Sequence, residues 1–368
     1  MQHAADPLQL AGFTIAVISH RRRHRLADLL ESHGARIVSV QGVRAVPQPD
    51  RDAVARATSD GLTGPVHDVL ATSAAGTRAW LQAAPGPQRL LETLRAARLL
   101  AADARTADTL RGYGLRDLLS TAAGSADELF RYLLTHAPTG RRIMAQLDAP
   151  TQAEACQALR DQGADVIEVP TYRTEPPNDV VGLRRVVELI TRRQLDAVAW
   201  LDPLSTGHVL RFAADHGRLP ALTEQLDAHI VTVSRGPLAA GVLRAHDITP
   251  AVPPLPFDEE TAMMLARSVL DRAVHATIGT STLEVRGHAA LLDGRLYPIQ
   301  QGPVDILRAL ARAPGAVLSS ADLRQQVPGL AHVDDHAIEM AVSRLRRAMP
   351  GVELVHTVIR RGYRLAIY

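Results

Sequence analysis

The sequence contains no lysine, and all 41 basic side chains among its 368 residues belong to arginine. A P-loop that holds phosphates with a lysine is therefore excluded, and so is an enzyme that forms a Schiff base through lysine. Receiver domains that accept a phosphoryl group use a lysine beside the aspartate. Phosphorylation of a receiver is thus not expected as the input of this chain.

A single cysteine, Cys156, excludes an intramolecular disulfide bond and a zinc site built from cysteines. Its neighbours Ala155 and Ala158 are typical of the buried side of a helix, so we expect a structural role for the thiol. Aromatic residues make up only 3% of the chain against 46% hydrophobic residues. This predicts cores built from alanine, leucine and valine.

Long apolar runs are also missing: no stretch approaches the ~18 residues of a membrane-spanning helix, and no apolar segment near the N-terminus resembles a signal peptide. We expect a soluble, cytoplasmic protein with no membrane partner. The length favours two or three domains. Residues 281–368 hold eleven arginines against eight acids, whereas residues 1–280 hold 30 against 31. The basic excess lies where a nucleic-acid reader would need it, although it is ordinary for a small domain.

The first 280 residues contain an internal repeat. Residues 15–40 and 143–169 both read as a strand, a helix, a Gly-Ala turn and a second strand. Further apolar segments match in pairs, and each half closes with a helix that has acids in its first turn. The matched pairs are 68–73 with 196–201, 98–102 with 229–233, and 125–134 with 258–270. The repeat predicts two α/β lobes with a ligand cleft between them.

Extended segments at 42–49 and 170–177 predict two crossings of the chain between the lobes. Residues 1–10 are expected to be frayed, and residues 273–282, which are mostly small, are expected to form a linker. The predicted bounds are therefore residues 12–45 plus 174–275 for lobe 1, 46–173 for lobe 2 and 283–368 for a third domain.

From Leu283 the pattern changes to short antiparallel strands with Asp293-Gly294 as a hairpin turn. Helices follow at 304–312 and after a Ser319 or Ser320 N-cap. A third helix is expected from about 334 to 349, because residues 338, 342, 345 and 349 share one face. A strand pair around 352–355 and 363–367 ends the chain.

The arginine-bearing helix is followed by Thr357-Val358 and Gly362-Tyr363-Arg364-Leu365. Together with the order of elements, this motif resembles the winged helix-turn-helix of OmpR/PhoB-type response regulators. The resemblance implies that the third helix enters the major groove of double-stranded DNA and that the hairpin wing lies toward the minor groove. The family often has arginine directly after Thr-Val, where this chain has Ile359. The DNA-contacting residues that the resemblance implies are His336, Met340, Ser343, Arg344, Arg347, Arg360 and Arg361.

Residues ~12–275 resemble uroporphyrinogen-III synthase, HemD, which closes and rearranges a linear tetrapyrrole with eight carboxylates. The matching segments are Ser19-His20-Arg21, Thr72-Ser73, 104–107 and 172–174. The resemblance implies two lobes joined by a two-stranded ladder, with the cleft as the site, and Tyr172 as the residue that assists catalysis if the chain is an enzyme; packing is the alternative role. Two departures occur: Trp200-Leu201-Asp202 replaces a serine-rich turn, and Leu238 replaces a threonine after Gly236-Pro237. A hydroxyl for a carboxylate is thereby lost, and Asp202 is expected to repel a polyanion.

His20-Arg-Arg-Arg-His24 has two histidines four residues apart, but three arginines would repel a metal ion, so we expect no metal and no cofactor. An anion site near a strand-to-helix turn is the functional interpretation; a basic rim is the alternative. The residues expected to line an effector or anion site are Ser19, Arg21, Arg22, Arg25, Thr72, Ser73, Thr106 and Tyr172.

Together these patterns predict a DNA-binding transcriptional regulator with a uroporphyrinogen-III synthase-like sensing or interaction domain, for a tetrapyrrole or another anionic effector. The fusion resembles actinobacterial regulators of nitrate and nitrite assimilation. The alternatives are an active synthase that carries a DNA-binding domain, and an interaction module that docks a response regulator on a shared promoter.

Overall fold

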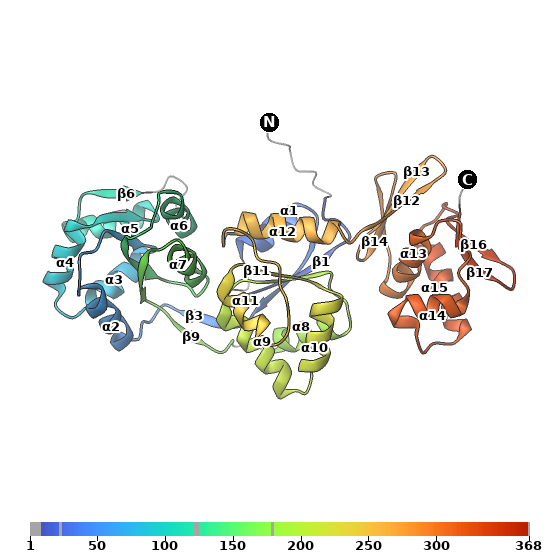
Figure 1. Ribbon diagram of the computed structural model, residues 1–368, viewed down its shortest axis with the longest axis horizontal. Helices are drawn as coiled ribbons and strands as arrows, with labels where there is room; N and C mark the ends of the chain where they lie inside the picture. The colour runs from blue at the N-terminus through green and yellow to red at the C-terminus, as the bar shows by residue number, and fades with distance from the viewer. Residues whose placement is uncertain (1–8, 22–23, 121–124, 178–179, 367–368) are drawn as a thin grey trace.

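A computed structural model of the protein describes residues 9–21, 24–120, 125–177 and 180–366. Three bodies lie in a row along the long axis of the molecule (Figure 1). Lobe 2 is at one end, lobe 1 is in the middle, and the C-terminal domain is at the other end.

Lobe 1 is built on a parallel sheet in the order β11-β10-β1-β2. Its strands are β1 (Thr14–Ser19), β2 (Arg36–Gln41), β10 (Ala197–Trp200) and β11 (Val231–Ser234). The helices are α1 (Arg25–Ser32), α8 (Val181–Thr191), α9 (Pro203–Asp215), α10 (Leu219–Ala228), α11 (Pro237–Arg244) and α12 (Asp258–Leu270). Helices α1 and α12 pack on one face, and α8 to α10 pack on the other. The central strand β1 is therefore buried throughout, which explains its continuous apolar run.

Lobe 2 repeats this arrangement with one more strand, in the order β6-β5-β4-β7-β8. Its strands are β4 (Asp68–Ala71), β5 (Arg98–Ala101), β6 (Leu118–Ser120), β7 (Arg142–Leu147) and β8 (Asp165–Pro170). Its helices are α2 (Arg51–Gly61), α3 (Ala74–Ala83), α4 (Pro87–Ala96), α5 (Ala104–Gly112), α6 (Ala126–Thr135) and α7 (Gln152–Asp161). Strands β8-β7-β4-β5 correspond to β2-β1-β10-β11, and these are the segments that the sequence repeat matched. The repeat is thus confirmed as two α/β lobes.

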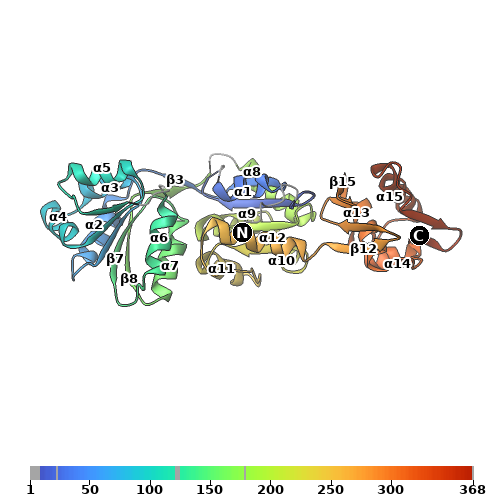
Figure 2. The same cartoon turned by 90° about the horizontal axis from the view of Figure 1, so that it is seen from above.

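A two-stranded antiparallel ladder connects the lobes (Figure 2). It pairs β3 (Arg44–Val46), which follows β2, with β9 (Arg173–Glu175), which follows β8. Because both crossings leave from the carboxyl end of a strand, the carboxyl edges of the two sheets face the space between the lobes. Ligands of open α/β sheets bind at such edges.

The C-terminal domain begins with a four-stranded antiparallel sheet of β12 (Val274–Ile278), β13 (Ser281–Val285), β14 (Ala289–Leu292) and β15 (Arg295–Pro298). The predicted linker at 273–282 is therefore wrong, because β12 and the turn to β13 occupy it. The predicted hairpin turn is confirmed: Asp293 and Gly294 both have positive φ, 48° and 79°.

Three helices and a hairpin complete this domain: α13 (Gln301–Arg312), α14 (Ser320–Gln326), a 3₁₀ turn η1 (Pro328–Leu330), α15 (Asp335–Ala348), β16 (Val355–Val358) and β17 (Gly362–Leu365). Ser319 is confirmed as the N-cap of α14, where it forms a capping box with Asp322. The first wing strand starts at Val355 and not at Val352. The apolar face of α15, Ile338, Val342 and Leu345, is buried in the domain core as its spacing predicts.

The C-terminal domain docks on lobe 1 through the turn between β13 and β14. Arg286 donates from Nη1 to the Ala11 carbonyl at 2.8 Å, and the His288 amide donates to the Gly12 carbonyl at 2.7 Å. A Cβ on Gly287 would lie 2.0 Å from the Asp196 carboxylate, so the approach requires glycine. The expected fraying at 1–10 does not extend to Leu10, which is buried in the lobe 1 core. Within the described ranges, no helix has the length and apolar character needed to cross a membrane.

Candidate functional site

The hydroxyl residues expected in the cleft lie after the carboxyl ends of parallel strands. Ser19 ends β1, Thr72 and Ser73 follow β4, and Thr106 is in the first turn of α5 after β5. Ser73 caps α3 by accepting from the Gly76 amide at 3.1 Å. Thr72 Oγ1 donates to the Gln146 carbonyl at 2.9 Å, so both side chains already serve the fold. Within the described chain, the buried Thr106 hydroxyl has no hydrogen-bond partner.

The basic segment after β1 is arranged differently from an open anion site. Arg25 is 65% exposed and forms an ion pair with Glu259 of α12 at 2.5 Å. Arg21 is exposed, and Arg22 lies outside the described residues. His24 is the N-cap of α1, accepting from the Leu26 amide at 3.2 Å. No cluster of metal-ligating side chains occurs among the residues that the structure describes.

Two histidines of this segment are held neutral. Burial, together with the charge of Arg21, lowers the pKa of His20 to about 3. Burial and Arg235 lower the pKa of His24 to about 4. Both ring nitrogens of His20 lack a hydrogen-bond partner within the described chain, and so does Trp200 Nε1. The carboxyl edge of lobe 1 thus contains buried polar atoms with unused hydrogen-bonding capacity.

Tyr172 lies between β8 and β9, where the chain leaves lobe 2 for the ladder. Its ring packs against the apolar cluster that contains Phe130, Leu133 and Cys156. Burial, followed by the charge of Glu168, raises the pKa of the phenol above its usual range. The hydroxyl is therefore protonated at neutral pH, which suits a hydrogen-bond donor as well as a packing residue.

A carboxylate from lobe 2 occupies the N-terminus of a lobe 1 helix. Glu154 of α7 is fully buried, and it accepts hydrogen bonds from the Leu238 and Ala239 amides of α11 at 2.9 and 2.7 Å. Amides of the first helical turn have no acceptor within their own helix, and the helix dipole favours an anion at this end. A Cβ on Gly236 would lie 2.4 Å from the carboxylate, so the Gly-Pro-Leu sequence allows its close approach.

A buried arginine extends this contact between the lobes. Arg235 is 3% exposed and binds Asp127 of lobe 2 at 2.8 Å and Asp258 of lobe 1 at 2.9 Å. Its Nε also donates to the Pro256 carbonyl at 2.7 Å. Burial raises the pKa of Asp258, because loss of water disfavours the charged carboxylate. The Arg235 guanidinium opposes this effect and stabilises the charged form.

Helix α12 and the residue before it, Phe257, also contact lobe 2. Arg131 of α6 forms ion pairs with Glu259, at 3.4 Å, and with Glu260. The same guanidinium lies 4.2 Å from the centre of the Phe257 ring, and that ring is buried in a core cluster of lobe 2. The lobes are thus held together by a polar and apolar contact that includes Glu154, Asp127, Arg131, Arg235 and Phe257.

Most of these contact residues were not predicted from the sequence. Glu154 and Asp127 have the pattern of ordinary acids in the first turn of a helix, and only the three-dimensional fold brings them to α11 and Arg235. Asp202, expected to repel a polyanion, is instead fully buried. It caps α9 by accepting from the Ser205 amide at 2.7 Å, and burial raises its pKa.

In the C-terminal domain, α15 presents the side chains expected to contact DNA. His336, Met340, Arg344 and Arg347 are exposed, whereas Ser343 is half-buried. Within the described chain, neither Arg344 nor Arg347 forms an ion pair or side-chain hydrogen bond. Arg346 has a structural role, because it donates to the Val355 carbonyl at 2.8 Å and to Thr357 Oγ1 at 2.9 Å, which fixes the wing to α15.

The wing hairpin exposes a basic and apolar tip. Strands β16 and β17 pair Val358 with Gly362, which leaves Ile359, Arg360 and Arg361 as the loop. Ile359 is 82% exposed, both arginines are exposed, and Arg360 has a positive φ of 59°. The hairpin is held to the domain by paired backbone hydrogen bonds between Tyr363 and Leu318.

The comparisons with known proteins agree with this architecture. A family model for uroporphyrinogen-III synthase HemD matches residues 24–283, and one for the transcriptional regulatory protein C-terminal domain matches residues 296–365. A mutant uroporphyrinogen III synthase from the extremely thermophilic bacterium Thermus thermophilus is 23% identical, with 71% of this chain and 99% of that chain covered and a TM-score of 0.39.

Two further similarities are more limited. The DNA-binding domain of E. coli CadC is 24% identical, covering 26% of this chain and 94% of its own, with a TM-score of 0.23. The uncharacterized protein YjjA of Bacillus subtilis (strain 168) is 23% identical over 164 residues, which are 45% of this chain. The match spans 60% of YjjA.

The family matches together cover both parts of the molecule. The chain therefore belongs to the uroporphyrinogen-III synthase HemD family and carries an OmpR/PhoB-type DNA-binding domain after the HemD-like lobes, as a DNA-binding regulator does.

Proposed function

We propose that the HemD-like domain is a sensor that binds a small polycarboxylate, such as a tetrapyrrole, and thereby controls DNA binding by the C-terminal domain. The observation that carries this proposal is the Glu154 carboxylate on the N-terminus of α11. A ligand carboxylate would compete with Glu154 for the same two amides. Ligand binding and separation of the lobes would then be linked.

Helix α12 offers a physical connection between the cleft and the DNA-binding domain. Glu259 and Glu260 in its first turn bind Arg131 of lobe 2, and its last turn leads through Ala273 directly into β12. A helix of 13 residues is about 20 Å long and moves as a rigid body. Because α12 is packed in the core of lobe 1, release of Arg131 would let lobe 1 and the attached β12 sheet move together relative to lobe 2.

DNA recognition is assigned to α15 and the wing. His336, Met340, Ser343, Arg344 and Arg347 would face bases and phosphates from the major groove. Arg360 and Arg361 would bind the flanking phosphates, because the wing loop exposes both. Regulation of nitrate and nitrite assimilation genes, and a response regulator as a partner on the promoter, remain predictions from the family resemblance.

The test is a footprint of the full chain on the DNA upstream of its own gene, with and without uroporphyrin or nitrogen metabolites. A protected site whose affinity changes about fivefold or more with uroporphyrin supports the proposal, since allosteric couplings are typically 5–150-fold. Absence of any protected site at moderate salt would overturn it. Turnover of hydroxymethylbilane that is lost in Tyr172→Phe would instead favour the synthase.

A further inference from the structure

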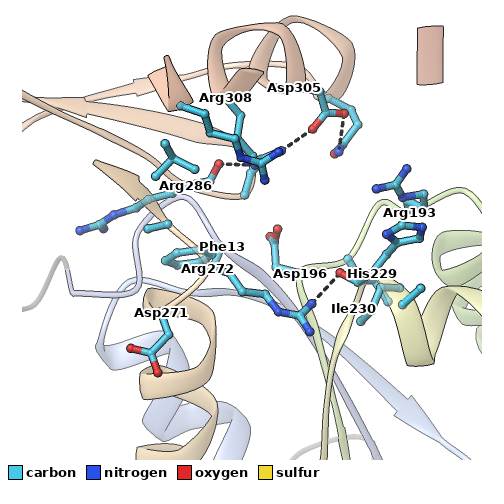
Figure 3. A pocket seen from close by; sticks show the side chains of 17 residues that line it. Phe13, Arg193, Asp196, His229, Ile230, Asp271, Arg272, Arg286, Asp305 and Arg308 are labelled. Carbon is cyan, nitrogen blue, oxygen red and sulfur yellow. Dashed lines mark hydrogen bonds and ion pairs between the residues drawn. The ribbon is translucent and has the colours of Figure 1, made fainter. Parts of the chain in front are cut away.

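A cavity lies at the junction between lobe 1 and the C-terminal domain, away from the contact between the two lobes (Figure 3). Its volume is about 540 Å³, within the usual range of small-molecule sites. Lobe 1 contributes the segments that follow α8, α10 and α12, and the C-terminal domain contributes α13 and the β13–β14 turn. The basic residues of its lining are Arg193, His229, Arg272, Arg286, Arg308 and Arg312.

Three of these arginines carry a charge that no acid neutralises. Within the described chain, Arg193, Arg272 and Arg312 take part in no ion pair, and the only side-chain hydrogen bond of Arg272 is a donation to the His229 carbonyl at 2.7 Å. Figure 3 shows Arg193 and Arg272 on either side of His229. Burial, with Arg193 as the next cause, lowers the pKa of His229, which agrees with this crowding of positive charge.

Acids in the lining mostly have partners of their own. Asp305 pairs with Arg308, and Asp196 accepts from the Thr14 amide at 2.7 Å and faces His288 at 3.2 Å. The remaining acid, Asp271, is exposed. The cavity therefore has an excess of unpaired guanidinium groups, supplied by both domains.

We propose that this cavity binds an anion with a diphosphate group, of nucleotide size. Guanidinium groups donate paired hydrogen bonds to phosphate oxygens, and a diphosphate has enough oxygens to bind Arg193, Arg272 and Arg312 together. A single carboxylate could not satisfy three arginines from three separate elements. The site is separate from the cleft, so it does not depend on the sensing function proposed for Glu154.

Occupation of this site would stabilise the docked position of the C-terminal domain. Arg193 and Arg272 precede β12, whereas Arg312 is at the end of α13. A ligand that contacts both sides binds the docked arrangement better than a separated one, and shifts the population toward it. The junction is otherwise held by few polar contacts, chiefly those of Arg286 and His288.

Isothermal titration of the full chain with pyrophosphate and with ADP, at constant ionic strength, tests the proposal. We expect saturable binding of pyrophosphate that weakens roughly tenfold or more in Arg193→Gln and in Arg272→Gln. Arg192→Gln is the matched control, because Arg192 is exposed beside Arg193 and is not part of the lining. Tighter binding of ADP would support a nucleotide ligand, and equal binding would support inorganic pyrophosphate.

Circular dichroism and thermal melting verify that each variant folds, and the exposed Arg312→Gln replaces any variant that does not. The proposal would be overturned by the absence of saturable binding of pyrophosphate or ADP, or by an equal loss of binding in Arg192→Gln. Binding of citrate without binding of pyrophosphate would also overturn it, since the site would then select carboxylates.

Discussion

Replacement of Glu154 by glutamine tests whether its carboxylate holds the lobes together. Glutamine keeps the size of the side chain but has one acceptor oxygen in place of two. One of the Leu238 and Ala239 amides would thus lose its partner, and the side-chain NH₂ would face the positive end of α11. Hydrogen bonds to a charged group contribute about 1.5–3 kcal/mol.

The expected loss is near the lower end of that range. Burial raises the pKa of Glu154, so part of the attraction to α11 is offset by the cost of desolvating the carboxylate. We expect the contact between α7 and α11 to weaken by about 1.5–2 kcal/mol, which is roughly a tenfold to thirtyfold increase in the population of the separated form.

Hydrogen exchange of a peptide that covers the first turn of α11 measures this change locally. Exchange should accelerate roughly tenfold or more in Glu154→Gln. Asp161→Asn, an exposed acid at the end of the same helix, is the control and should leave exchange unchanged. Equal exchange rates in Glu154→Gln, Asp161→Asn and the parent chain would refute the role of Glu154 in holding the lobes.

Three further changes have defined outcomes. Arg344→Ala should weaken binding to the operator by about 1–3 kcal/mol if the side chain reads a base edge, whereas an equal loss on unrelated DNA in anisotropy titrations would indicate a phosphate contact. Gly362→Ala should destabilise the C-terminal domain in thermal melting, because its φ is 129° and a Cβ would lie 2.0 Å from the Leu318 carbonyl oxygen; Gly302→Ala, in open space, should not. His20 stays neutral in the fold but gains a proton on unfolding below about pH 6.5, so stability decreases as the pH falls toward about 3. In urea titrations between pH 4 and 6, His20→Leu should reduce this dependence by up to about 1.4 kcal/mol per pH unit, and an unchanged slope would contradict the buried neutral state.

The two lobes could be predicted from the sequence because the repeat consists of short local patterns of apolar residues and glycine. The strands after Gly34 and Gly163 are apolar runs that follow a helix and a left-handed glycine, and both glycines have positive φ. Strand β12 has weaker local signals. Its residues are partly small, and its extended form depends on pairing with β13, from Val274 opposite Val285 to Ile278 opposite Ser281. Such pairing is a tertiary contact that composition does not reveal.

The site was predicted less well than the fold for a related reason. Thr72 and Ser73 follow a strand end and were found by that position, yet hydrogen bonds within lobe 2 already use them. Glu154 has the signature of an ordinary first-turn acid, and nothing near it in sequence indicates that its partners are the Leu238 and Ala239 amides, 84 and 85 residues away. Contacts over such sequence distances leave no local pattern from which they could be predicted.

The charged side chains at the contact between the lobes largely neutralise one another, and this matters for whether the domain senses a ligand or catalyses a reaction. Arg235 has two carboxylate partners, Arg131 binds two glutamates, and His20 is neutral because burial lowers its pKa. A polyanionic ligand would gain little from Arg235 and Arg131, since each guanidinium must first lose an internal partner. Its binding energy would instead be spent on separating Glu154 and Asp127 from lobe 1. A ligand that must open the lobes to bind necessarily has different affinities for the closed and open forms, and that difference is the thermodynamic requirement for a regulator.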